Sequence, residues 1–172
     1  MTGPRGFTLI ELVAVLAIMA LTAAAVALDI RGPLRRIGMR SCLDEVVAFD
    51  RLTRTYAQEQ DRAVQVMVDL GAGRLRRTDE EGRADLGTPV EVPAPYRLAR
   101  LRLAGQDIRW GTAALACSPQ GLTPTWAILV EGPGNRRRWA VFAGLSGQVL
   151  ETENDHDVDS LFAAIETGRQ PG

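Results

Sequence analysis

The sequence predicts an α+β protein in which a long N-terminal helix is followed by an antiparallel β-sheet. Apolar residues recur at helical spacing as far as about Gln60, and from Val64 onward they alternate with polar residues. Further along, two apolar and aromatic runs flank Gly132-Pro133-Gly134-Asn135, which is typical of a β-hairpin turn. The 172 residues and the formal charge of −1 indicate one modest globular domain without the basic field of a nucleic-acid-binding fold.

The N-terminal helix begins in an apolar segment that is long enough to span a membrane. Residues 7–28 contain one charged residue, Glu11, and a helix of this length measures roughly 33 Å, against a hydrocarbon core of about 30 Å. Arg5 precedes the segment, whereas the charges that follow it nearly cancel, which favours a cytoplasmic N-terminus. We therefore expect a single transmembrane segment over residues 7–30, with the remainder of the chain in the periplasm or its equivalent.

The carboxylate of Glu11 needs a cationic partner, because an ionised group inside a bilayer costs roughly 2.5–3.5 kcal/mol and normally marks a functional site. The apolar segment offers no cation within one helical turn of Glu11. Cleavage of the chain after Gly6 would supply one, because Phe7 would then carry a free α-amino group. That amine would neutralise the Glu11 of a neighbouring copy.

Gly6, Phe7 and Glu11 resemble the type IV prepilin signature, in which a short leader ends in Gly and precedes an N-methylated Phe, with a Glu four residues further on. The resemblance implies that prepilin peptidase removes residues 1–6, that Phe7 is methylated, and that Glu11 acts in assembly. It also implies three partners: other pseudopilins, an inner-membrane assembly platform and membrane lipid. Two alternatives remain: an uncleaved signal anchor, and a secretory signal peptide that is cleaved after Ala25-Val26-Ala27.

Residues 31–60 are expected to form the periplasmic half of the same helix. Gly32-Pro33 predicts a kink or a short break, because proline lacks an amide donor and clashes with the preceding turn. The helical pattern then resumes, and most charged residues, Asp50 among them, fall away from its apolar stripe. The stripe that we expect to face the sheet consists of Met39, Cys42, Val46, Phe49, Leu52 and Tyr56.

The β domain is expected over residues 61–150. Its predicted strands are residues 64–70, a short strand at Leu75, an edge strand at 90–92, and then 98–103, 108–110, 126–131, 139–143 and 148–150. Residues 78–88 are polar and acidic, and they predict a surface loop.

This second half resembles the pseudopilin group that contains type II secretion protein H and the FimT-like proteins. The matching parts are the strand Ile108–Trp110, the turn Ser118-Pro119-Gln120-Gly121, the hairpin, and the closing strand at Gly147-Gln148-Val149. The resemblance implies a minor pseudopilin, a non-enzymatic structural subunit of the periplasmic pseudopilus in type II secretion. The alternative is a FimT-like minor type IV pilin that binds DNA for uptake. Residues 151–172 extend past the family pattern.

No residue pattern indicates an enzyme. His156 is the single histidine and lies in an acidic segment, so a histidine-based metal cluster cannot form within one chain. Cys42 and Cys117 lack the spacing of zinc or redox motifs, and both a disulfide and two free buried thiols remain open. We expect no catalytic residue and, calcium apart, no cofactor.

The acidic extension over residues 151–172 has two interpretations. Four carboxylates match positions 1, 3, 5 and 12 of a calcium-binding loop, namely Asp155, Asp157, Asp159 and Glu166. Position 6 of that loop is Ser160, where a sharp turn requires glycine. In the other interpretation Asp159 is the N-cap of a short amphipathic helix, Ser160–Thr167.

Arg136, Arg137 and Arg138 lie at the tip of the predicted hairpin and are the residues that would contact DNA phosphates in the alternative function. They are equally consistent with a charged, solvent-facing turn. No aromatic platform for stacking bases adjoins them, and the surrounding charge is balanced, so DNA is not the expected partner.

Overall fold

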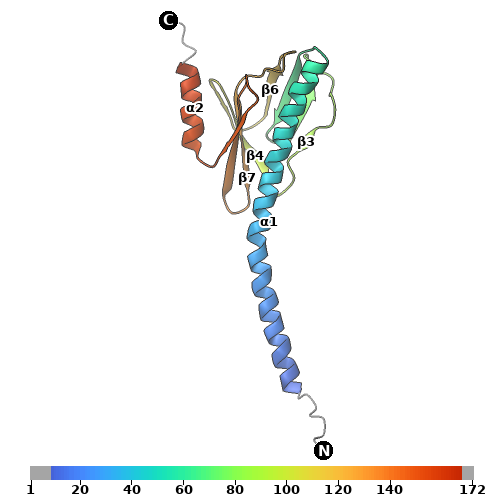
Figure 1. Ribbon diagram of the computed structural model, residues 1–172, viewed down its shortest axis with the longest axis vertical. Helices are drawn as coiled ribbons and strands as arrows, with labels where there is room; N and C mark the ends of the chain where they lie inside the picture. Colours follow the sequence, from blue (N-terminus) through green and yellow to red (C-terminus); the bar gives the residue numbers. More distant parts are fainter. Residues whose placement is uncertain (1–8, 168–172) are drawn as a thin grey trace, which may run out of the picture. The chain divides into compact units, whose positions relative to one another are not determined.

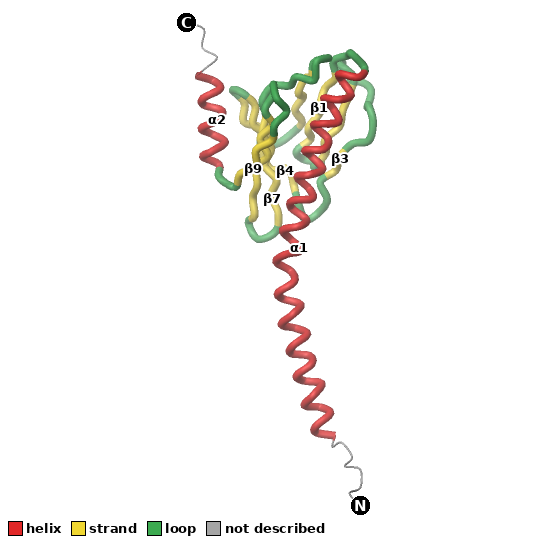
Figure 2. The backbone as a smooth tube through the Cα atoms, viewed as in Figure 1, coloured by secondary structure: helices red, strands yellow, loops and turns green. Residues whose placement is uncertain are grey.

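The computed structural model describes residues 9–167, apart from the side chains of residues 11, 22–37 and 166–167. It confirms the predicted α+β class. In the described chain, helix α1 (Leu9–Glu59) precedes nine strands in two sheets, and helix α2 (Asp155–Thr167) follows them (Figures 1 and 2).

Helix α1 is continuous over 51 residues and passes through Gly32 and Pro33. The predicted short break at this pair is therefore wrong. An interior proline removes one backbone hydrogen bond, yet the turns on either side remain paired and can carry the helix past it. The helix contributes to two compact units, Met1–Gly38 and Met39–Gly172, of which the second is globular.

The strands form two antiparallel sheets, where one was expected. The four-stranded sheet has the order β3-β2-β1-β6 and contains β1 (Val64–Asp69), β2 (Arg74–Thr78), β3 (Val90–Glu91) and β6 (Thr112–Cys117). The five-stranded sheet has the order β5-β4-β7-β8-β9 and contains β4 (Arg97–Leu103), β5 (Gln106–Ile108), β7 (Trp126–Gly132), β8 (Arg136–Phe142) and β9 (Val149–Thr152). Hydropathy alternation locates strands but does not say which strands pair, so this division was not predictable.

Strand β6 is the one strand that the sequence reasoning missed. Its buried residues are Ala113, Leu115 and Cys117, and they alternate with exposed residues as in any half-buried strand. The exposed positions include further alanines, so hydropathy does not alternate along the strand even though burial does. The preceding predicted strand, Ile108–Trp110, is correct only at its first residue, because β5 ends at Ile108 and Trp110 is 85% exposed.

One hydrophobic core joins helix α1 to both sheets. Residues of α1 from Met39 to Phe49 pack with Val66, Val68 and Leu75 of the first sheet and with inward residues of the second. The inward residues of the second sheet are Leu98, Leu101, Trp126, Ile128, Val130, Ala140 and Phe142. The rings of Trp126 and Phe142 stack at 4.0 Å between centroids, which fixes the register of β7 and β8 from inside.

Strands β7 and β8 are buried on both faces, which explains their unbroken apolar runs. Their outward residues form a second core with Val158 and Phe162 of α2. Helix α2 lies on the side of this sheet opposite to α1 (Figure 2). The C-terminal extension therefore completes the fold by covering a face of the sheet that α1 cannot reach.

Helix α2 begins at Asp155, five residues before the predicted start. Asn154 caps it, since its Oδ1 accepts a hydrogen bond from the His156 amide at 3.0 Å. The expectation that Asp159 is the N-cap is therefore wrong. Asp159 lies within the helix, and the cap side chain of Asn154, five residues earlier, already accepts a hydrogen bond from an amide of the first turn.

The buried face of α1 differs from the predicted stripe at its C-terminal end. Leu52 is 63% exposed, whereas Asp50 and Arg54 are only 1% and 8% exposed. The assignment of Asp50 to the solvent side is therefore wrong. Asp50 can be buried because it forms an ion pair with Arg54, whose Nε donates a hydrogen bond to Asp50 Oδ2 at 2.7 Å. The two charges are therefore buried together.

Arg54 also binds two loops of the β domain. Its Nη1 donates to the carbonyl oxygens of Gly121 at 3.1 Å and Gly144 at 2.8 Å, and its Nη2 donates to Thr123 Oγ1 at 2.6 Å. The loops themselves touch: a Cβ added at Gly144 would lie 2.1 Å from the Thr123 carbonyl oxygen. Only glycine allows this approach, which brings both carbonyl groups within reach of one guanidinium.

The two cysteines are free and buried. Burial raises the pKa of the Cys42 thiol to about 11, with a further contribution from Glu45, and burial also raises the pKa of Cys117. Cys42 belongs to the main core, and Cys117 packs with Ala57 and Val64 at the end of α1. The structure thus has the two free thiols that were one of the sequence-based alternatives.

We predict that Arg54→Met lowers the free energy of unfolding by about 3–5 kcal/mol, because it leaves the Asp50 charge buried without a partner. Urea unfolding of the full chain in detergent, followed by the fluorescence of the buried tryptophans, measures the change. Arg51→Met is the matched control, because Arg51 is exposed on the same helix and should change stability by no more than about 0.5 kcal/mol. Equal stabilities of the two variants would contradict the role of Arg54.

We predict that both thiols resist alkylation in the folded protein. The Cys42 thiol has a pKa of about 11, so at pH 8 its thiolate fraction is on the order of one in a thousand. Burial also blocks access of the reagent to both thiols. Mass spectrometry after iodoacetamide treatment without reductant should find no adduct on the folded chain and two adducts in urea. An unmodified chain in urea would reveal a disulfide instead.

Candidate functional site

The candidate assembly segment is the N-terminal part of α1. Gly6 and Phe7 lie outside the described residues, and so does the side chain of Glu11, whose backbone belongs to the helix. The described apolar side chains around it are all at least 45% exposed. They are Leu9, Ile10, Leu12, Val13, Val15, Leu16, Ile18, Met19 and Leu21.

These residues cover the helix on every side rather than along one stripe. A helix that is apolar all round is stable only inside an apolar environment, such as lipid or a bundle of other helices. In the part of the chain whose side chains are described, no helical stretch is both long and apolar enough to cross a membrane. The predicted span over residues 7–30 lies partly outside that part.

Two of the aspartates proposed for calcium binding pair with arginines of the sheet, and one of these arginines belongs to the triplet proposed for DNA binding. Arg137 pairs with Asp155 at 3.2 Å, and Asp155 also accepts a hydrogen bond from Trp139 Nε1 at 2.7 Å. Arg102 of β4 pairs with Asp159. These contacts surround the apolar seam between α2 and the sheet, so the charges hold α2 in place.

Arg136, Arg137 and Arg138 lie on β8, after the hairpin turn rather than at its tip. Arg138 pairs with Glu151 at 3.4 Å and with Glu153 at 2.5 Å, and these carboxylates raise its pKa. With Arg137 also paired, Arg136 is the one member of the triplet without a hydrogen bond or ion pair from its side chain to the described residues.

The aspartates of the predicted calcium loop do not converge. Asp157 accepts hydrogen bonds from Thr152 Oγ1 at 2.8 Å and Asn154 Nδ2 at 3.0 Å, while Asp155 and Asp159 face different arginines. The described residues contain no group of three acidic, histidine or cysteine side chains placed to hold a metal ion. The side chain of Glu166, the fourth carboxylate of the predicted loop, lies outside them.

His156 is exposed on the first turn of α2, as expected. Its backbone amide donates a hydrogen bond to the Asn154 side chain, which gives this position a structural role in starting the helix. The sequence reasoning missed Arg54 and Asp50 because a charge on an amphipathic helix normally marks the solvent side. Only the polar contacts of the distant loops reveal their position.

Comparisons with known proteins concern the N-terminal segment and the fold. Residues 1–27 match the family model of the prokaryotic N-terminal methylation motif, which includes Gly6, Phe7 and Glu11. No curated protein matches the sequence. The match confirms the prepilin resemblance of the N-terminus.

The fold is similar to two solved structures of the minor pseudopilin EpsH from the type 2 secretion system of Vibrio cholerae. One has a TM-score of 0.50 at 12% identity, covering 66% of this chain and 94% of that chain. The other has a TM-score of 0.51 at 11% identity, covering 69% and 97%. At such identities the likeness concerns the fold, and the fold of this protein is pseudopilin-like.

We predict that calcium leaves the thermal stability of the protein unchanged, because the aspartates are already engaged by arginines, Thr152 and Asn154. Thermal unfolding with millimolar calcium should give the same midpoint as unfolding with a chelator, and magnesium serves as the control cation. A midpoint that rises with calcium alone would establish a site that includes residues outside the described chain.

Proposed function

We propose that this protein is a minor pseudopilin, a structural subunit of a type II secretion pseudopilus. The observation that carries the proposal is the combination of a methylation motif over residues 1–27 with a pseudopilin-like fold in the same chain. Neither feature alone has this force, since the motif opens many filament subunits and the fold likeness is remote. Together they support a subunit with a processed N-terminal helix that carries a globular head.

The proposed mechanism is mechanical. Prepilin peptidase removes residues 1–6 and leaves an amine on Phe7, which is then methylated. The amine of one subunit pairs with Glu11 of its neighbour, and this pairing offsets the cost of a buried carboxylate and sets the register between subunits. Exposed apolar residues such as Leu12, Val15 and Leu16 then exchange lipid for the helices of neighbouring subunits.

The globular unit would move as one body with its part of α1. Val46 and Phe49 are buried in the main core, and Arg54 ties the end of the helix to two loops. Axial force on the helix would therefore reach the sheets through packed side chains and not through a single linker. A subunit built in this way suits a filament that grows by drawing protomers out of a membrane.

The proposed location follows from this mechanism. The precursor sits in the inner membrane with its N-terminus in the cytoplasm and its globular unit in the periplasm, and it joins the periplasmic pseudopilus after processing. Its partners are other pseudopilins, prepilin peptidase and the assembly platform, and it performs no catalysis. The FimT-like alternative with DNA gains no support from the arginine triplet, because Arg137 and Arg138 already pair with carboxylates.

We predict that Glu11→Ala leaves expression and membrane insertion intact but abolishes incorporation into the filament, because the Phe7 amine loses its partner. Crosslinking and shearing of assembled fibres, followed by immunoblotting, measure incorporation. Glu45→Ala is the control, since it removes an exposed carboxylate from the same helix. Normal incorporation of Glu11→Ala would refute the assigned role.

N-terminal sequencing of assembled subunits should begin at Phe7, and a start at Met1 or Leu28 would refute the processing step.

A further inference from the structure

We propose that the outer edge of strand β6 binds one extended, uncharged segment of a partner protein by strand addition. Strand β6 is an edge strand of the four-stranded sheet and forms a ladder with β1 alone (Figure 1). The inference is independent of the proposed assembly function, which uses the N-terminal part of α1.

Every second residue of β6 has its backbone groups turned away from β1. The Leu70 amide donates to the Gly111 carbonyl oxygen at 3.0 Å, which continues the register of the β1–β6 ladder. Hydrogen-bonded and non-hydrogen-bonded pairs alternate along such a ladder, so Thr112, Ala114 and Ala116 belong to the non-hydrogen-bonded pairs. Their amides and carbonyl oxygens have no hydrogen-bond partner in the part of the chain that the structure describes. Donors and acceptors therefore alternate along the open edge, and another extended backbone is the group that matches them.

The other edge strands of the two sheets are shorter and carry charges, as natural edges usually do. Strand β3 has two residues and ends at Glu91, β5 has three and contains Asp107, and β9 has four and contains Glu151. Strand β6 has six residues, and its sequence contains neither a charge nor a proline. Its ladder with β1 also runs without a register shift. An edge of this length without protection against pairing is expected where pairing has a use.

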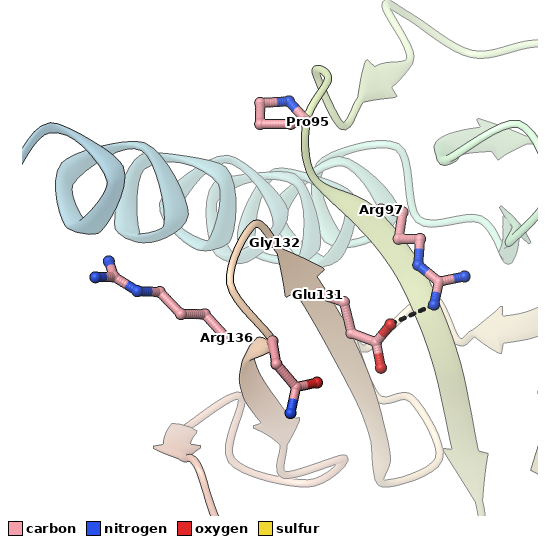
Figure 3. Close-up of a pocket in the computed structure, with 6 residues that line it drawn as sticks. Pro95, Arg97, Glu131, Gly132 and Arg136 are labelled. Carbon is pink, nitrogen blue, oxygen red and sulfur yellow. Dashed lines mark hydrogen bonds and ion pairs between the residues drawn. The ribbon is translucent and has the colours of Figure 1, made fainter. Parts of the chain in front are cut away.

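The surface beside this edge favours an uncharged segment. Elsewhere a ladder ends in a charged cross-strand pair, as where Arg97 of β4 meets Glu131 of β7 (Figure 3). The exposed side chains of β6 are one threonine and two alanines, and β1 places Gln65 and Met67 beside the alanines. A charged side chain on an added strand would find no opposite charge on β6 and would lose part of its hydration. Uncharged β-branched side chains avoid this cost and suit a strand.

The neighbouring strand β5 favours a single segment over the sheet edge of a second folded copy. Residues 109–111 alone connect β5 to β6, yet the two strands belong to different sheets. Ile108 of β5 packs against the same core as Leu115 of β6, so β5 lies near the open edge. The four residue steps from Ile108 to Thr112 span at most about 14 Å, and neighbouring strands lie about 4.8 Å apart. At this end, a separation within that limit admits at most one added strand, whereas a folded copy would bring its own sheet.

The test is amide hydrogen exchange of the full chain in nonionic detergent, measured residue by residue by NMR. The probe is a synthetic peptide with blocked ends and the uncharged sequence Val64–Val68, because that sequence already pairs with β6 on its other side. We expect saturable binding that slows exchange of the Thr112, Ala114 and Ala116 amides about tenfold or more. The amides of the alternate residues should exchange slowly with and without the peptide, because they bond to β1.

Two substitutions at one exposed position separate backbone pairing from side-chain contact. Ala114→Pro removes an outward amide and places the proline ring where the added strand would lie, while the hydrogen bonds to β1 remain. The affinity for the peptide should therefore fall roughly tenfold or more. Ala114→Val is the matched control: it keeps the amide and suits a strand, so the affinity should change by less than about twofold.

Absence of saturable binding overturns the proposal, and so does binding that leaves the three outward amides unprotected. Equal affinities of Ala114→Pro and Ala114→Val overturn it as well. Protection that rises with protein concentration in the absence of peptide would assign the edge to a second copy and overturn the choice of a partner segment. The exchange pattern of the wild type requires no variant, so it decides the matter even if Ala114→Pro fails to fold.

Discussion

The architecture of the globular unit depends on one buried interaction, the pair of Arg54 with Asp50. Two charges in an apolar interior are tolerated only when hydrogen bonds satisfy them, and here Arg54 obtains acceptors from its own helix and from two loops. Those acceptors exist only if Gly144 lies against the backbone at Thr123. The position of the helix and the shape of both loops are therefore determined together.

Burial on both faces of β7 and β8 explains why the protein has an acidic C-terminal helix. The inward face is covered by α1, which leaves Trp139 and Val141 to be covered from the other side. An amphipathic helix with acidic residues suits this task, because arginines of the sheet surround the apolar seam. Arg137 of the predicted DNA contact and Asp155 of the predicted calcium loop thus meet in a single ion pair beside this packing contact.

Sequence reasoning identified most strands and the class of the fold, because burial in this domain is periodic and hydropathy reports it. It failed in β6, where buried Ala113 has alanine neighbours, so the hydropathy of the residues does not show the alternation of buried and exposed positions. At Gly32-Pro33 local propensity predicted a kink or a short break, and of these the break is absent because the helix is continuous. The pairing of strands into two sheets depends on contacts between distant segments, which no local pattern encodes.

Charged residues show most clearly what a sequence can reveal about a site. The surroundings of Glu11 are its own apolar neighbours in the chain, so its need for a partner is evident from residues 7–28 alone. The surroundings of Asp50 and Arg54 come from Gly121 and Gly144, more than sixty residues away. A carboxylate among local apolar residues is therefore recognisable as a candidate functional residue, whereas a carboxylate buried by tertiary contacts looks like any solvated residue. The candidate assembly site could be named before the fold was known because the chemistry that defines it is local.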